Sequence, residues 1–176
     1  MMRELYKKTK QLFPLGDLTE QRHDLVFVSI PHPFLSSLLR HLRDKEGFSH
    51  LVLLTAVDWL ERGEFQLTYL LCNRSKAWDM GVRVVLPREG ATMESIHTLW
   101  PTAATYQREL KEMFGIDFPG SPGVNDDFIL EGWDDIPPYR RDFDTLKFAE
   151  ARFTQRPGRE SLDPAQHMAK HHSDGS

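Results

Sequence analysis

The residues best able to bind a metal are the histidines, and their spacing argues against a metal site. The chain has eight of them. His32, His41 and His50 stand nine residues apart, so they fall on a loop, a helix and the start of a strand and not on one helical face. A second group lies in the polar run HMAKHHSDGS (residues 167–176), where binding would be weak. We therefore predict structural or surface roles for the histidines and no metal bound by this chain.

The carboxylates and the single thiol offer no catalytic arrangement either. The pairs Asp126-Asp127 and Asp134-Asp135 lie in a stretch without regular periodicity, whereas general acid–base chemistry needs a pKa shifted by a formed pocket. Cys72 is the only cysteine, which excludes an internal disulfide and ligation of zinc or an iron–sulfur cluster by several thiolates. The sequence has no Gly-x-Ser-x-Gly, phosphate-binding loop or dinucleotide fingerprint. We predict no catalytic and no cofactor-binding residue in this chain.

Length and charge favour a small globular domain whose partners are not nucleic acids. A chain of 176 residues suggests one main domain with an appendage. The net charge is -4 and the isoelectric point is near 6.1, whereas a nucleic-acid binder normally carries a basic face. No run approaches the roughly 18 apolar residues that a membrane span needs. We expect any attachment to a membrane to be indirect, through partners.

Hydrophobic periodicity over residues 1–119 predicts an α+β domain of two layers, with helices packed on a mostly antiparallel or mixed sheet. Short connections join three apolar runs and favour an antiparallel meander, and the nearly all-apolar first run is expected to be the central strand. The predicted strands are 24–31, 49–59, 64–72 and 80–87. The predicted helices are 2–13, 33–46, 92–100 and 101–114.

The stretch RELKEMFGIDFPG (residues 108–120) carries the most specific local signal. Apolar residues recur at helical spacing up to its glycine, while Gln107 and the charged residues near it occupy the rest of the predicted helix surface. Gly115 stands where a left-handed residue commonly ends a helix. We predict that this glycine turns Ile116 and Phe118 back onto the core.

The pattern changes beyond Pro119. Prolines become frequent and no period of 2 or 3.6 persists, yet aromatic residues continue as far as Phe153. A disordered chain usually lacks such residues, so an aromatic segment without a core of its own predicts docking onto another surface. The run PYRRDF (residues 138–143) adds two arginines of the kind that protein interfaces favour. We expect a partner-docking arm over residues 120–154 and a disordered tail over residues 155–176.

The stretch from Ala104 to Phe143 resembles the signature of the C subunit of proton-pumping NADH–quinone oxidoreductase (complex I), a family that includes the related component of membrane-bound nickel–iron hydrogenases. That signature runs Glu-Arg-Glu, two residues, Asp, Met or Leu, Phe-Gly-Ile, one residue, Phe, one residue and Gly-His-Pro. The matching positions in this chain are Gln107, Arg108, Glu109, Glu112, Met113, Phe114, Gly115, Ile116, Phe118, Gly120, Ser121 and Pro122.

The family pattern continues with two arginines, a Trp, and then Pro-Leu-Arg-Lys-Asp and an aromatic residue. Trp133 keeps its spacing from the preceding Pro, and the block from Pro138 to Phe143 follows after one extra residue. The chain also departs from the pattern at several positions. Gln107 replaces Glu, Glu112 replaces Asp and Ser121 replaces His, and the family's arginine pair falls on Asn125 and Asp126.

The resemblance implies a subunit that binds no cofactor and performs no redox step itself. Such a subunit packs on the neighbouring subunit that descends from the hydrogenase large subunit, beside its iron–sulfur neighbour, at the cytoplasmic side of the membrane. Iron–sulfur clusters, and any quinone or nickel–iron site, would then belong to the partner subunits. The residues implied at the partner interface are Arg108, Glu109, Phe114, Gly115, Ile116, Phe118, Trp133, Tyr139, Arg140, Arg141, Asp142 and Phe143.

Two alternatives to a quinone-reductase subunit stay open at this point. The first is the equivalent subunit of a membrane-bound, energy-converting nickel–iron hydrogenase. The second belongs to another class: a free-standing small enzyme that uses Asp58, His97 or the aspartate pairs.

Overall fold

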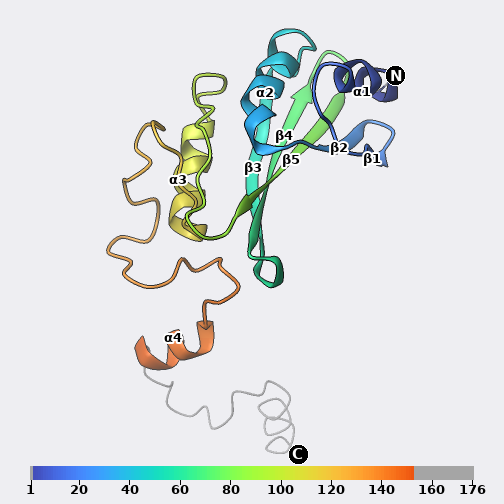
Figure 1. The fold of residues 1–176 in the computed structure, drawn as a ribbon. Helices are drawn as coiled ribbons and strands as arrows, with labels where there is room; N and C mark the ends of the chain where they lie inside the picture. The colour runs from blue at the N-terminus through green and yellow to red at the C-terminus, as the bar shows by residue number, and fades with distance from the viewer. Residues whose placement is uncertain (1, 153–176) are drawn as a thin grey trace, which may run out of the picture. The chain divides into compact units, whose positions relative to one another are not determined.

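A computed structural model describes residues 2–152 (Figure 1). The chain divides into two compact units, residues 1–143 and residues 144–176. The first unit has the α+β fold that the sequence predicts, whereas the tail expected at residues 155–176 lies outside the described residues. The helices and strands of the first unit are α1 (Met2–Lys10), β1 (Thr19–Arg22), β2 (Leu25–Ser29), η1 (His32–Phe34), α2 (Leu35–Asp44), β3 (His50–Trp59), η2 (Leu60–Arg62), β4 (Glu64–Asn73), β5 (Trp78–Pro87) and α3 (Ala103–Phe114).

The five strands form one mixed sheet in the order β1-β2-β5-β4-β3. The predicted meander is confirmed, because β3 pairs with β4 and β4 with β5 in antiparallel fashion through short connections. The sequence did not reveal two further pairings. Strand β2 runs parallel to β5, and the short strand β1 pairs antiparallel with β2.

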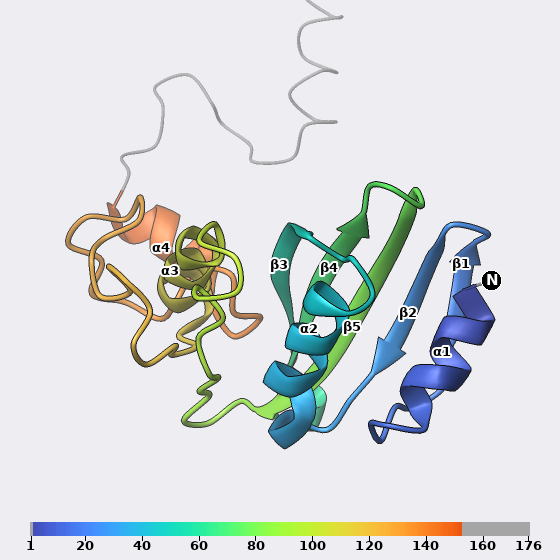
Figure 2. The same cartoon turned by 90° about the horizontal axis from the view of Figure 1, so that it is seen from above.

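One face of the sheet forms the core. In β4, the alternating residues Phe65, Leu67, Tyr69 and Leu71 are all fully buried, as their period of two requires. Helices α1 and α2 lie along the same side of the sheet (Figure 2). Helix α2 places four fully buried leucines against this face, and Leu39 is one of them. The opposite face carries half-buried and exposed side chains such as Val57 and Val85.

The prediction that the run at 49–59 is the central strand is wrong, because β3 is an edge strand and β5 is central. The apolar character of β3 has another cause. Helix α3 and the loop before it pack against β3, where the Tyr106 hydroxyl donates to the Val52 carbonyl at 2.8 Å and the Trp100 indole donates to the Ser49 carbonyl at 3.1 Å. An edge strand covered in this way needs apolar residues just as a central strand does.

The prediction of a helix over residues 92–100 is also wrong. This stretch is irregular, with an isolated bridge at Thr92 and a turn at residues 97–99, although its apolar side chains are buried. The Met93 N–H donates to the Asp117 carbonyl and the Asp117 N–H donates to the Ala91 carbonyl, both at 2.9 Å. This pairing with the chain after α3 takes up backbone groups that a helix would use internally.

The unit from residue 144 onward contains helix α4 (Thr145–Arg152), which the sequence analysis missed. Asp144 caps this helix, since its carboxylate accepts hydrogen bonds from the N–H groups of Leu146 and Lys147. These hydrogen bonds lower the pKa of Asp144, and the bond from the Lys147 N–H has the largest effect. The helix has no fully buried residue and no apolar stripe, which explains why periodicity did not reveal it.

Candidate partner interface

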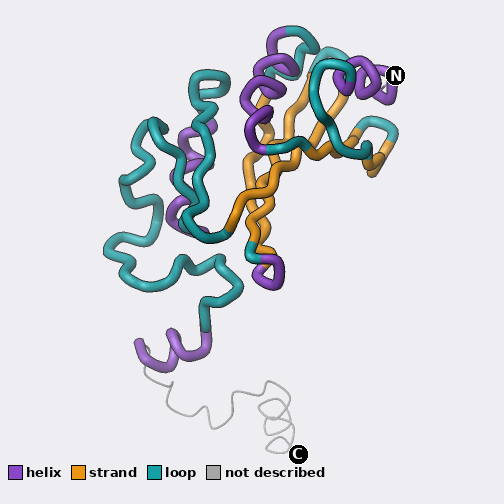
Figure 3. Tube along the Cα trace, in the orientation of Figure 1, coloured by secondary structure: helices purple, strands orange, loops and turns teal. Residues whose placement is uncertain are grey.

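The candidate interface is built on the C-terminal end of helix α3. The predicted helix stop is confirmed: Gly115 has φ +79° and its N–H donates to the Lys111 carbonyl at 2.9 Å. Ile116 and Phe118 then turn back into the core and are fully buried, also as predicted. The glycine therefore redirects the chain and starts an irregular stretch, the 119–143 segment, which Figure 3 shows as a continuous loop.

Glu112 fixes the first half of the 119–143 segment. Its carboxylate accepts three backbone hydrogen bonds, from the N–H groups of Phe128 at 2.6 Å, Ile129 at 2.9 Å and Leu130 at 3.1 Å. The Arg108 guanidinium lies 5.5 Å from the centre of the Phe128 ring, close enough for a cation–π contact. One charged side chain on α3 thus replaces the strand or helix partner that this backbone lacks.

A cluster of charged groups fixes the second half. Arg88 makes a two-pronged contact with Asp58, at 2.9 Å and 3.1 Å, and reaches Asp142 at 2.6 Å. The Arg141 N–H donates to Asp58 at 2.9 Å. The Asp58 side chain is only 1% exposed and that of Arg88 13% exposed. A buried bidentate pair that also accepts a backbone N–H holds the segment to the end of β3.

These contacts shift the titration of the groups involved. The hydrogen bond from Arg88 lowers the pKa of Asp142, and the nearby Arg140 charge lowers it further. Hydrogen bonds to Asp58 and then to Asp142 raise the pKa of Arg88, so that this guanidinium stays charged. Arg88 and Asp142 therefore both carry their charges at neutral pH.

Apolar side chains on the outer side of the segment stay in contact with solvent. Ile129 is 67% exposed, Tyr139 is 58% exposed and Ile136 is 41% exposed. The backbone beneath Tyr139 is nevertheless fixed, because its N–H donates to the Met113 carbonyl at 3.0 Å and its ring meets that of Phe114 edge to face at 5.7 Å. The segment is thus an ordered support for exposed apolar groups.

The structure divides the predicted interface residues into two sets. Phe114, Ile116 and Phe118 are buried in the domain, so the prediction that they form a contact surface needs correction. Their side chains fill the core below the turn at Gly115 and can only position the segment. The remaining residues lie partly or fully exposed on α3, at its C-cap or on the 119–143 segment, where contact with a partner stays a prediction: Arg108, Glu109, Gly115, Trp133, Tyr139, Arg140, Arg141, Asp142 and Phe143.

Two departures from the family signature contact each other. The prediction that Gln107 lies on the helix surface is wrong, because it is fully buried and its Oε1 accepts hydrogen bonds from Ser121 and Ser95, both at 2.7 Å. Gln107 and Ser121 stand where the family has Glu and His. A neutral amide with a hydroxyl therefore takes the place of an acidic residue with an imidazole.

Sequence reasoning missed three residues that shape the site. Asp58 was named only as a possible catalytic group of a free-standing enzyme, Arg88 was not singled out, and Glu112 was noted only as a replacement for Asp. A carboxylate at a strand end and an arginine just after another strand were the available signals.

Among residues 2–152, no group of three or more His, Cys, Asp or Glu side chains is placed to hold a metal ion. No helix in this part of the chain is long and apolar enough to cross a membrane.

The fold and the site define a class of protein: an α+β domain with helices on one face of a mixed sheet and an irregular C-terminal segment fixed by charged groups. Within this class, the chain belongs to the family described as respiratory-chain NADH dehydrogenase, 30 Kd subunit, whose model matches residues 28–149. The resemblance seen in the stretch from Ala104 to Phe143 is confirmed.

Curated relatives include the C subunit of the NADH-quinone oxidoreductase of Moorella thermoacetica, which is 31% identical over 147 residues, or 81% of this chain and 95% of the relative. The corresponding protein of Novosphingobium aromaticivorans is 29% identical over 86% of this chain, but the match spans only 50% of that longer protein. A combined C/D subunit of the Aquifex aeolicus enzyme is 32% identical over 70% of this chain and 21% of its own length.

Two solved structures have the same fold. A chain of the membrane-bound sulfane sulfur reductase, an archaeal respiratory membrane complex, superposes with a TM-score of 0.77 and 26% identity over 88% of this chain and 96% of its own. A trypsin-resistant fragment of Nqo5 superposes with a TM-score of 0.57 and 24% identity over 69% of this chain and 96% of the fragment.

Proposed function

We propose that this chain is a non-catalytic subunit of a complex I-like, membrane-bound respiratory oxidoreductase, and that it scaffolds the cofactor-bearing large subunit. The observation that carries the proposal is the 119–143 segment: a stretch without its own core, fixed by Glu112 and Asp58, that presents Ile129 and Tyr139 to solvent. Exposed apolar groups on an ordered support are typical of a protein interface.

The proposed partner is a subunit related to the hydrogenase large subunit, together with its iron–sulfur neighbour. The Aquifex aeolicus relative supports this pairing, since its name joins the C and D subunits in one protein. The iron–sulfur clusters and any quinone site would lie in those partners. The chain itself would be a peripheral component on the cytoplasmic side, held to the membrane only through them.

An equivalent place in a hydrogenase-type complex is the second candidate. The likeness to a chain of the membrane-bound sulfane sulfur reductase keeps this candidate open, because this fold also occurs in a respiratory membrane complex other than NADH–quinone oxidoreductase. A free-standing enzyme is disfavoured by the site geometry. Both oxygens of Asp58 are occupied by Arg88 and by the Arg141 N–H, which leaves this carboxylate unable to act as a base without breaking the cluster.

The experiment that tests the proposal is mass spectrometry of the proteins that co-purify with the tagged chain from detergent-solubilised native membranes. We expect a hydrogenase-large-subunit-like protein in stoichiometric amount, and loss of that protein from the variant with Arg140→Glu and Arg141→Glu. Circular dichroism of the isolated variant is the control for folding. A chain that purifies alone from membranes and cytosol would refute the proposal.

A further inference from the structure

Strand β5 loses its neighbour halfway along its length. Strand β2 pairs with it from Asp79 to Arg83, and the last bond of this ladder runs from the Ile30 N–H to the Arg83 carbonyl at 3.0 Å. Pro31 follows, and the chain turns away into the short helix η1. Strand β5 continues to Pro87 with β4 as its only paired strand, while η1 lies near β5 without pairing with it.

The separation of the two strands leaves a backbone edge at Val85. Peptide groups along a strand point alternately to its two neighbours. Since the Arg83 carbonyl points toward β2, the N–H and carbonyl of Val85, two residues on, point to the same side. Within residues 2–152 neither group has a hydrogen-bond partner, and the Val85 side chain is 46% exposed. An unpaired strand edge of this kind is a template for pairing with another extended chain.

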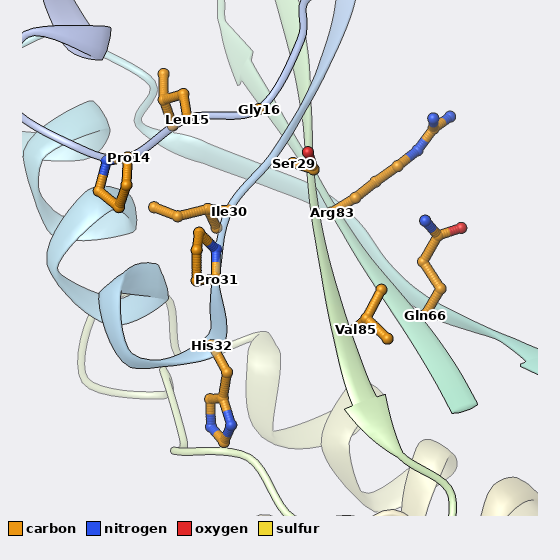
Figure 4. Close-up of a pocket in the computed structure, with 10 residues that line it drawn as sticks. All are labelled: Pro14, Leu15, Gly16, Ser29, Ile30, Pro31, His32, Gln66, Arg83 and Val85. Atoms are coloured by element: carbon orange, nitrogen blue, oxygen red, sulfur yellow. The ribbon is translucent and has the colours of Figure 1, made fainter. Parts of the chain in front are cut away.

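A recess of about 360 Å³ lies along this edge (Figure 4). Its apolar wall consists of Pro14, Leu15, Ile30, Pro31 and Val85.

The rim of this recess is fixed in place. The Gly16 N–H donates to the Ser29 carbonyl at 2.9 Å, and the Tyr6 hydroxyl donates to the Gly16 carbonyl at 2.9 Å. A Cβ at Gly16 would lie 2.1 Å from the Ser29 Oγ, so a larger residue there would force the Ser29 hydroxyl into another rotamer. The recess is therefore held open by the fold and is not formed by a loose loop.

The recess also presents one cation. Arg83 and Gln66 project from neighbouring strands in the same direction beside the recess (Figure 4). The Arg83 guanidinium lies 4.2 Å from the centre of the Phe27 ring and has no carboxylate partner in the described part of the chain. A guanidinium held over a ring in this way is preorganised for a carboxylate of a ligand.

We propose that this recess binds an extended segment of a partner subunit, which adds to the free edge of β5. Its backbone would pair with the N–H and carbonyl of Val85, an aliphatic side chain would lie against Leu15 and Ile30, and a carboxylate would meet Arg83. This is strand addition, in which backbone bonds provide affinity and side-chain pockets provide specificity. The identity of the partner as a subunit of the same complex rests on the proposed function, whereas the chemistry of the segment follows from the recess.

Amide hydrogen exchange of the free chain and of the assembled complex tests this inference. We expect exchange of the Val85 amide to slow by at least about tenfold on assembly, because a new hydrogen bond protects it. In the complex, Arg83→Glu should abolish this protection, whereas Arg40→Glu, the same charge change on the exposed side of α2, should leave it intact. Arg83→Gln, which keeps a polar side chain over Phe27, gives the same expected result should the glutamate variant misfold.

The outcomes separate this inference from the proposed function. Assembly with unchanged exchange at Val85, or with equal protection in the Arg83 and Arg40 variants, would overturn the strand addition alone. Failure of the wild-type chain to assemble with any large subunit would overturn the proposed function and this inference with it.

Discussion

The packed sheet and the 119–143 segment belong to the same compact unit, yet different contacts hold them. Around β4 and α2 the contacts are apolar, between side chains with no exposed surface. The 119–143 segment buries Val124 in the core, but two carboxylates, Glu112 and Asp58, accept backbone N–H groups along it. A few well-placed charges can thus order a segment that has no core of its own and keep apolar side chains available for a partner.

The largest expected effect is in the sheet core. Leu39→Ala should lower the free energy of unfolding by about 2–5 kcal/mol, because the substitution leaves a cavity in a fully buried cluster. Ile129→Ala, which removes aliphatic carbons from a side chain that is 67% exposed, is the matched control and should change it by less than about 0.5 kcal/mol. Urea unfolding monitored by circular dichroism measures both. Equal losses would show that the segment is part of the core.

Disrupting the charged cluster should give the second-largest loss of free energy of unfolding. Asp58→Ala should cost about 1–3 kcal/mol, because Arg88 stays buried with only Asp142 and the Arg141 N–H loses its acceptor. Amide exchange should locate the loss at residues 137–143, and Glu61→Ala, which breaks an exposed ion pair with Arg141, should have little effect. Uniformly faster exchange throughout the sheet would contradict a local role.

Substitutions at the turn between the two regions should have the third-largest effect on stability. Gly115→Val should cost about 1 kcal/mol or more, since a β-branched residue is strained at φ +79°. The added Cβ would also lie 3.4 Å from Pro137. Gly115→Asn should be milder, because Asn tolerates the left-handed region better. Melting temperatures of the two variants measure the difference, and an unchanged temperature for the valine variant would reject this account of the turn.

Lowering the pH should loosen the 119–143 segment before it unfolds the core. The effect on stability should be smaller than that of the substitutions above. The pKa of Asp142 is lowered in the folded chain by Arg88, so its contribution to stability is complete above the pKa of the unfolded chain, about 3.9, and is lost as the pH falls through the lower folded value. The part of the tryptophan fluorescence that Trp133→Phe removes should therefore change, as the pH falls from 6, before the circular dichroism of the sheet does. Simultaneous changes would indicate that the two regions do not differ.

Local signals in the sequence predicted much of the domain and little of the segment. The β4 alternation, helix α3 and Gly115 follow from period and from turn chemistry, which act over a few residues. The parallel pairing of β2 with β5, the edge position of β3 and the irregular course of residues 92–100 depend on contacts between distant parts of the chain. The charged cluster joins Asp58 to Arg88 and Asp142, separations that no local pattern records.

Photo-cross-linking in native membranes tests the central claim, that the 119–143 segment faces a partner subunit, most directly. A benzophenone amino acid replaces Ile129 in one variant and the exposed Lys45, at the end of α2, in a control variant. After irradiation, mass spectrometry identifies the adducts. We expect a cross-link from position 129 to the hydrogenase-large-subunit-like protein and none to it from position 45. Absence of that adduct at position 129 in an assembled complex would contradict the account.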